Sequence, residues 1–331
     1  MRGDLRIIAA ILLTSAAFAQ TGTAPSEVPV VGMLNYIHAT NDLDQTLAFY
    51  HDVFGLDSPA PRPLASPGIP ALTNSPGVTL RLSTLHFPNT AFGFELTQFS
   101  GVDRKAGQAR HTDPGAALIA LRVMDIEPVL AAVKKMNVPI ITTSGVPVTI
   151  VSPNGKLRSL LIRDPDGYIV EVVESAPPAD AAAVGNVYGA SMGLTVGDKD
   201  TTLKFYQGLL GFDLKGKLEF SSDLPIVDLI GAPHAKFREL VGNVPGTKAL
   251  MAFYEYKGIP RTPFHLRVSD PGAPAIALRV QDLDGLLTRM RAARVQVTSA
   301  RGEVVQFSPT TRNIFVEDPN GLNVELFESK Q

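Results

Sequence analysis

Hydrophobic spacing predicts two helices of the same kind in distant parts of the chain. In each segment, apolar residues recur at intervals of three or four, which places them along one face of a helix. Each segment follows an aspartate, a residue that caps helix N-termini. The first ends at Gly55, a residue suited to closing a helix. The apolar positions of the two stripes are Leu43, Leu47, Tyr50 and Phe54, and Leu283, Leu287 and Met290.

Short apolar segments before and after these helices predict strands. Four of them open a unit and precede a helix: Met33–Thr40, Leu118–Val123, Ser191–Val196 and Ala275–Val280. Others follow the helices, among them Val78–Leu85, Phe92–Phe99, Tyr168–Val173 and Asn323–Phe327. The chain therefore reads as four units of strand, helix and about three strands, which is an α+β fold of βαβββ units.

Three pairs of matching segments show that the chain repeats itself. DLDQTLAFYHDVF at 42–54 matches DKDTTLKFYQGLL at 198–210, and DPGAALIALRV at 113–123 matches DPGAPAIALRV at 270–280. DPDG at 164–167 matches DPNG at 318–321, and both run into an apolar strand that contains one glutamate. We therefore predict two copies of one domain, at residues 30–175 and 187–329, joined by a linker rich in proline and alanine at 176–186. Pairing of the two units inside each copy is expected to leave a cupped sheet.

Composition and charge exclude several classes of protein. The 331 residues contain 30 Lys and Arg against 32 Asp and Glu, a net charge of −2, which argues against binding to nucleic acid. Cysteine is absent, which excludes disulfides, thiolate zinc sites and iron–sulfur clusters.

The N-terminus has the pattern of a secretory signal peptide. Arg2 and Arg6 precede an apolar run, and Ala17-Phe18-Ala19 supplies the small residues of a cleavage site. We predict cleavage after Ala19, export to the periplasm or the medium, and no membrane association afterwards. An uncleaved anchor is the alternative, although the run is short for a membrane span of ~20 residues.

The order of these motifs resembles the vicinal oxygen chelate superfamily, which includes glyoxalase I, bleomycin-resistance proteins and extradiol dioxygenases. The resemblance rests on Phe49-Tyr50 before Leu56, on Phe205-Tyr206, and on the late DPDG and DPNG strands. It implies glyoxalase-like domains, each with a cupped sheet, over essentially the whole chain after residue 30.

The resemblance also implies metal-ligand positions, which this chain fills only in part. In the first copy these positions hold Asn35, Glu95, Leu118 and Glu171, and in the second copy Ser191, Ala252, Ala275 and Glu325. The second copy lacks the two histidines and one carboxylate of an extradiol dioxygenase, so that activity is not expected. Asn35, Glu95 and Glu171 are the candidate ligands for one divalent cation, and binding without any cofactor is the alternative.

Strand alternation predicts which side chains line the cup. For a small-molecule pocket in the first copy we expect Ile37, Thr97, Arg122 and Ile169 beside Glu95 and Glu171. His38 falls on the opposite face, under the helix, and is expected to be structural. The other histidines lie on a helix surface, in loops or at strand ends, and are expected to be solvated.

Two functions remain open from the sequence. In the first, the cup of the first copy binds a small organic molecule without a metal, and the second copy is mainly structural. In the second, a glyoxalase-like lyase or isomerase uses a divalent cation, with Glu95 and Glu171 as the catalytic pair. Two carboxylates in one buried cup must share a proton or a cation, which suits proton transfer next to a carbonyl.

Overall fold

The computed structural model describes residues 28–152 and 155–329, and the fold that it shows contains the four expected units. The predicted signal peptide at residues 1–19 lies outside the described residues. Within those residues, no helix combines the length and apolar character that crossing a membrane requires.

Each unit begins with a long strand and a helix. The first contains β1 (Val30–Thr40), α1 (Leu43–Phe54), β2 (Arg62–Pro63), α2 (Ile69–Leu72), β3 (Thr79–His86) and β4 (Gly93–Ser100). The second contains β5 (Ala117–Val123), α3 (Glu127–Lys135), β6 (Val148–Ser152), β7 (Gly155–Arg163) and β8 (Ile169–Glu174). The third contains β9 (Val187–Val196), α4 (Lys199–Leu203), the π-helical turn η1 (Lys204–Leu209), β10 (Lys215–Gly216), α5 (Leu224–Leu229), β11 (Lys236–Asn243) and β12 (Leu250–Lys257). The fourth contains β13 (Pro274–Val280), α6 (Leu283–Ala292), the 3₁₀ turn η2 (Ala300–Gly302), β14 (Val305–Gln306), β15 (Thr311–Glu317) and β16 (Asn323–Ser329).

Local chemistry explains where the predicted helices begin and end. The Asp42 side chain accepts hydrogen bonds from the first free amides of α1, at 3.1 and 3.2 Å. Gly55 closes that helix with φ of 68°, a conformation that costs a glycine little. Asp282 caps α6 through the Gly285 amide at 2.9 Å. The helical spacing read from the sequence thus has a physical stop at each of these ends.

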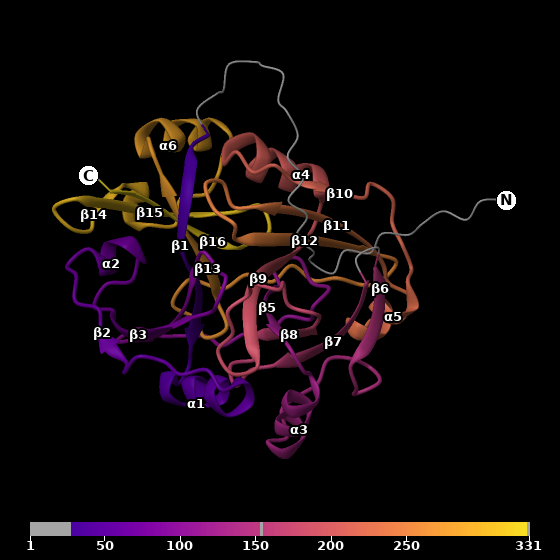
Figure 1. Ribbon diagram of the computed structural model, residues 1–331. Helices are drawn as coiled ribbons and strands as arrows, with labels where there is room; N and C mark the ends of the chain where they lie inside the picture. The colour runs from indigo at the N-terminus through magenta and orange to yellow at the C-terminus, as the bar shows by residue number, and fades with distance from the viewer. Residues whose placement is uncertain (1–27, 153–154, 330–331) are drawn as a thin grey trace.

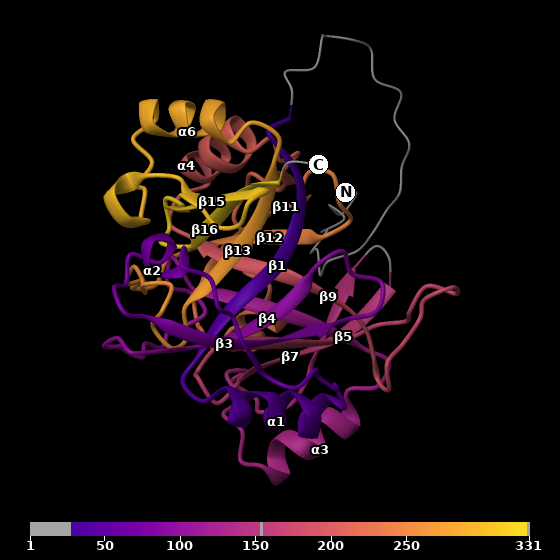
Figure 2. The same ribbon diagram turned by 90° about the vertical axis from the view of Figure 1, so that its left-hand side faces the viewer.

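The strands form two eight-stranded sheets, and each sheet combines units from both copies (Figures 1 and 2). The first sheet has the order β14-β15-β16-β13-β1-β4-β3-β2, so the first unit is joined to the fourth. The second has the order β10-β11-β12-β9-β5-β8-β7-β6, so the second unit is joined to the third. The joints are the antiparallel pairs β1–β13 and β5–β9. The expectation that each cup forms inside one copy is therefore wrong, because the unit-opening strands pair across the copies.

The two units of one copy meet instead through their helix-covered faces. Helices α1 and α3 contact each other, and so do α6 and η1 (Figures 1 and 2). Between the sheets, the Tyr36 hydroxyl donates to the carbonyl oxygen of Leu118 at 3.1 Å and also contacts the Tyr168 hydroxyl. The opposite faces of the sheets carry separate apolar clusters, one around Ile37 and Ala275, the other around Leu118 and Tyr256.

Candidate functional site

The first sheet brings Asn35 and Glu95 together, as the sequence predicts. Asn35 on β1 donates from Nδ2 to Glu95 Oε2 at 2.7 Å, and the Thr97 hydroxyl donates to Glu95 Oε1 at 3.1 Å. Burial raises the pKa of Glu95, and these two donors partly offset the rise. Ile37 lies beside this group, in the apolar cluster of the same face.

Glu325, rather than Glu171, is the second carboxyl of this buried group, which is called the first hollow below. It stands on β16, and its side chain accepts a hydrogen bond from Asn313. Burial raises the pKa of Glu325 to about 7, and the nearby Glu95 carboxylate adds to the rise. The two carboxyls therefore share one low-dielectric environment, and their ionisations are linked.

Glu171 belongs to the second sheet, so the predicted cluster of Asn35, Glu95 and Glu171 is not formed. Its strand, β8, pairs with β5, and β5 pairs in turn with β9 of the other copy. Leu118, Ile169 and Arg122 lie on the face of the second sheet that carries Glu171. Ile37 and Thr97 lie on the first sheet, beside Glu95. The predicted pocket residues are thus divided between two hollows because of the pairing across copies.

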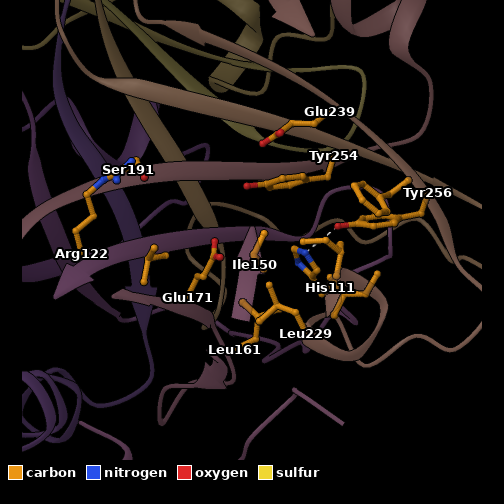
Figure 3. A pocket seen from close by; sticks show the side chains of 14 residues that line it. His111, Arg122, Ile150, Leu161, Glu171, Ser191, Leu229, Glu239, Tyr254 and Tyr256 are labelled. Atoms are coloured by element: carbon orange, nitrogen blue, oxygen red, sulfur yellow. Dashed lines mark hydrogen bonds between the residues drawn. The ribbon is translucent and has the colours of Figure 1, made fainter. Parts of the chain in front are cut away.

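A cavity opens on this face of the second sheet, and Glu171 points into it (Figure 3). The Ser159 hydroxyl donates to Glu171 Oε1 at 2.7 Å. Burial raises the pKa of Glu171, while Ser159 and the charge of Arg122 oppose the rise. Ser159 and Asn313 hold equivalent repeat positions, so the two late-strand glutamates are anchored in the same way.

Glu239 on β11 is the second carboxyl of the cavity, and the sequence analysis missed it. Its Oε1 atom is buried and has no hydrogen-bond partner in the part of the chain that the structure describes. Burial and the neighbouring Glu171 raise the pKa of Glu239 well above its usual range. The signal was available: the repeat counterpart of Glu239 is the buried Leu82, and a carboxyl in a buried strand position needs a reason.

Aromatic side chains form the side of the cavity away from Arg122 (Figure 3). The Tyr256 hydroxyl lies 2.9 Å from His111 Nε2, and the Tyr254 ring lies 5.7 Å from the His111 ring. His111 is 5% exposed, so the expectation of a solvated loop histidine is wrong. Burial and the charge of Arg163 lower the pKa of His111 to about 4, which keeps the ring neutral.

Apolar residues complete the cavity, which α5 covers. The volume is small, about 50 Å³, enough for a few waters or a narrow organic group. The Ser191 hydroxyl lines it and is buried without a hydrogen-bond partner among residues 28–152 and 155–329. The apolar lining residues are Ile150, Leu161, Val173, Ile226, Leu229, Ile230 and Phe237.

The two hollows differ in what they offer a metal ion. The first provides three side chains with oxygen donors, Asn35, Glu95 and Glu325, and the remaining implied position is Ala275. In the second, Leu118 and Ala252 occupy two of the four implied positions and carry no donor atom, which leaves Ser191 and Glu171. Oxygen donors of this kind suit a hard divalent cation. The first hollow supplies three of them from the implied positions, whereas the second supplies two there and a third, Glu239, from outside those positions.

A further cluster, His38 with Asp164 and Asp166, lies under α1 and has the residue types of a metal site. His38 Nε2 is 2.9 Å from Asp164 Oδ2 and 3.5 Å from Asp166 Oδ2. The second copy has Leu194 and Asn320 in place of His38 and Asp166. Compared with the second copy, His38 adds one positive charge when protonated and Asp166 adds one negative charge. A buried ion pair therefore accounts for the cluster without a metal. His38 is on the helix-covered face, as strand alternation predicts.

Comparison with known proteins identifies the architecture. The family model described as "Glyoxalase/Bleomycin resistance protein/Dioxygenase superfamily" matches residues 33–172 and 190–326. A lactoylglutathione lyase of Arabidopsis thaliana is 27% identical over 188 residues, 56% of either chain, and one from Oryza sativa subsp. japonica is 26% identical over 189 residues, 56% of this chain and 55% of the relative. The chain thus spans about half the length of the curated relatives that it matches.

Solved structures show the same fold. Glyoxalase I from Zea mays is 21% identical, with a TM-score of 0.59 over 90% of this chain and 92% of that one. A putative dioxygenase from Bacillus subtilis is 15% identical, with a TM-score of 0.54 over 92% and 86% of the two chains. At these identities the likeness concerns the fold and leaves the chemistry to be argued from the side chains.

Proposed function

Since the chain belongs to the glyoxalase, bleomycin-resistance protein and dioxygenase superfamily, we propose that it binds a small organic molecule in the cavity of the second sheet. One observation carries this proposal: Glu239 Oε1 and the Ser191 hydroxyl are buried at the cavity without hydrogen-bond partners in the described chain. A buried polar group left unpaired costs roughly 1–3 kcal/mol. A ligand that supplies the missing partners recovers part of that cost on binding.

Both copies contribute to this site, in place of the first copy alone. Glu171 and Arg122 come from the first copy, while Ser191, Glu239 and Tyr254 come from the second. Burial raises the pKa of both Glu171 and Glu239, and the charge of Glu171 adds to the rise at Glu239, which favours a protonated Glu239 beside an ionised Glu171. The pair can then both donate and accept a hydrogen bond, which suits a hydroxyl or carbonyl group on a ligand otherwise held by apolar walls.

A thermal-shift screen tests this binding. Short alcohols, amides and hydroxylated aromatics are added to the purified protein and to two variants. Ser191→Phe fills the cavity; Asn35→Val changes the same repeat position in the other hollow and is the control. We expect some compounds to raise the melting temperature of the wild type and of Asn35→Val, because a ligand that binds only the native state stabilises it. The proposal is contradicted if the compounds protect Ser191→Phe as well as the wild type, or if they do not protect the wild type. Ser191→Val is the smaller change and replaces Ser191→Phe in the comparison if that variant does not fold.

A glyoxalase-like lyase or isomerase activity in the first hollow is a second candidate. Asn35, Glu95 and Glu325 are its residues, and the close grouping of these oxygen donors favours it. A divalent cation held there would act as a Lewis acid on a bound carbonyl. The curated relatives named lactoylglutathione lyase support this candidate only over about half of the chain.

Metal analysis separates this candidate from plain binding. We expect one equivalent of a divalent cation in the wild type and in Glu171→Gln, and none in Glu95→Gln or Glu325→Gln. Turnover of lactoylglutathione is then measured in the metal-loaded protein. A protein that takes up no cation under any loading condition excludes the candidate, and binding in the second sheet is unaffected by that result.

Export remains a proposal that rests on the N-terminal segment. Arg2, Arg6 and the Ala17-Phe18-Ala19 site support it. Mass spectrometry of the protein purified from its natural source tests it: we expect an N-terminus at Gln20, and an intact Met1 in the folded protein would contradict cleavage.

A further inference from the structure

A larger groove adjoins the small cavity of the second sheet. Arg122 and Ser191 line both spaces. The groove has a volume of about 500 Å³, ten times that of the cavity. A ligand that passes between these two residues can occupy both spaces, with one end in the cavity and the other in the groove.

The segment that joins the two copies forms one wall of this groove. Ser175, Ala176, Pro178, Asp180 and Ala181 line it. The segment is held at both ends: Asn89 Nδ2 donates to the Ala182 carbonyl at 2.8 Å, and the Tyr188 and Ser175 hydroxyls lie 2.5 Å apart. The wall is therefore a fixed part of the fold rather than a loose connection.

Charge distinguishes the two ends of the combined space. Lys248 lines the groove, together with one aspartate, Asp180, and Arg122 stands at the junction, where its charge also acts on Glu171. The inner end holds the carboxyls of Glu171 and Glu239, both of which line the cavity, and the charge of Glu171 opposes ionisation of Glu239. The combined space thus has an inner end with a carboxyl oxygen, on Glu239, that is unpaired in the described chain, and apolar walls beside it. Its outer end carries the two basic side chains, Arg122 and Lys248.

We infer that the ligand of this site is a narrow, elongated organic acid, whose hydroxyl or carbonyl end reaches Glu171 and Glu239 and whose carboxylate lies between Arg122 and Lys248. This inference rests on the proposed binding function and adds the ligand's class. A cation at the outer end would meet Arg122 and Lys248 and be repelled. A ligand with two apolar ends would leave Glu239 and Ser191 unpaired, at the cost that unpaired buried groups carry.

Three linear probes of equal chain length separate the contributions of the two ends. Hydroxyoctanoate carries both end groups, octanoate carries only the acid, and octanediol carries only hydroxyls. Titration calorimetry measures each against the wild type. We expect hydroxyoctanoate to bind most tightly, and each missing end group to weaken binding by about tenfold or more, as for hydrogen bonds to charged or buried groups.

Two variants locate the acid end, and a third is the matched control. We expect Arg122→Gln and Lys248→Gln to weaken hydroxyoctanoate and octanoate about tenfold while octanediol binds as before. Arg279→Gln alters the repeat counterpart of Arg122 in the first sheet and should change nothing. If octanediol binds as tightly as hydroxyoctanoate, or if Arg122→Gln and Lys248→Gln weaken all three probes alike, the acid assignment is overturned while binding in the cavity stands. If no probe binds the wild type, the acid assignment is also overturned, and the thermal-shift screen decides separately on the binding function.

Discussion

His38 Nε2 lies 2.9 Å from Asp164 Oδ2, and both side chains are fully buried between α1 and the sheet that α1 covers. The contact links the two units of the first copy, because His38 stands on β1 and Asp164 follows β7. The equivalent position in the second copy is Leu194, packed in the apolar core. The same fold therefore tolerates either an ion pair or an aliphatic side chain at this point.

A double-mutant cycle tests whether His38 and Asp166 act as a unit. His38→Leu alone leaves Asp164 and Asp166 buried side by side without a cation, and we expect a loss of roughly 3–5 kcal/mol in the free energy of unfolding. Asp166→Asn alone should lower the free energy of unfolding by less, because His38 still forms its ion pair with Asp164. The double variant reproduces the pair Leu194 and Asn320 of the second copy and should recover most of the loss. Denaturant titration measures the three values, and additive losses would contradict the coupling.

The same ion pair makes stability depend on pH on the alkaline side. Burial alone would lower the pKa of His38, but Asp164 and Asp166 outweigh it and raise the pKa from 6.5 to about 9. The folded state thus holds a proton that the unfolded chain releases, so this stabilisation is complete below pH 6.5 and is lost as pH rises through about 9. We expect His38→Leu/Asp166→Asn to flatten the decline of the melting temperature between these values. An unchanged slope in that variant would assign the decline to other groups.

Glu325 gives a second pH dependence, in a lower range. Its folded pKa of about 7 stands above the ordinary 4.5, so the folded state binds the proton more tightly than the unfolded chain. The associated stability is present below pH 4.5 and is lost as pH rises through about 7. Glu325→Gln, which cannot ionise, should be more stable than the wild type at pH 8, by about 1–3 kcal/mol. Asn313→Ala is the companion variant: loss of its donor should raise the pKa of Glu325 further, measured by NMR titration.

Gly193 and Tyr254 pair a small residue with a large one, whereas their counterparts in the first sheet pair a large residue with a smaller one. A Cβ on Gly193 would lie 2.8 Å from Tyr254 Cε2, and the equivalent residues of the first copy are Ile37 and Thr97. Gly193→Ala should push Tyr254 from its place, lower stability by about 1–3 kcal/mol and weaken ligand binding in the cavity.

The reciprocal double variant checks that explanation. Gly193→Ile with Tyr254→Thr copies the pair found in the first sheet and should be more stable than Gly193→Ile alone. Thermal unfolding measures the difference. A double variant no more stable than Gly193→Ile would show that the clash involves other atoms, of which Leu118 Cγ, at 2.9 Å, is the nearest.

The sequence predicted the four units and the faces of their strands, but it did not predict which units pair with each other. Helical spacing with an aspartate before it located α1 and α6, and strand alternation placed His38 and Asn35 on opposite faces of β1. Internal repetition revealed the copies but contains no information on whether β5 pairs with the opening strand of its own copy or with β9. Glu171 was assigned to the wrong hollow for that reason. Glu239 and His111 were missed because a search for chemistry common to both copies passes over polar residues whose counterparts are apolar, although such a difference is itself a signal.

The crossed pairing of the units has a consequence for how such a molecule holds together. A single copy on its own would present β1 and β5 as bare strand edges, with two half-built hollows beside them. Two such halves would satisfy each other by assembling edge to edge. The polypeptide between residues 175 and 187 turns that encounter into an intramolecular event at high effective concentration, so a single chain has the internal architecture of a dimer whose two halves are free to diverge.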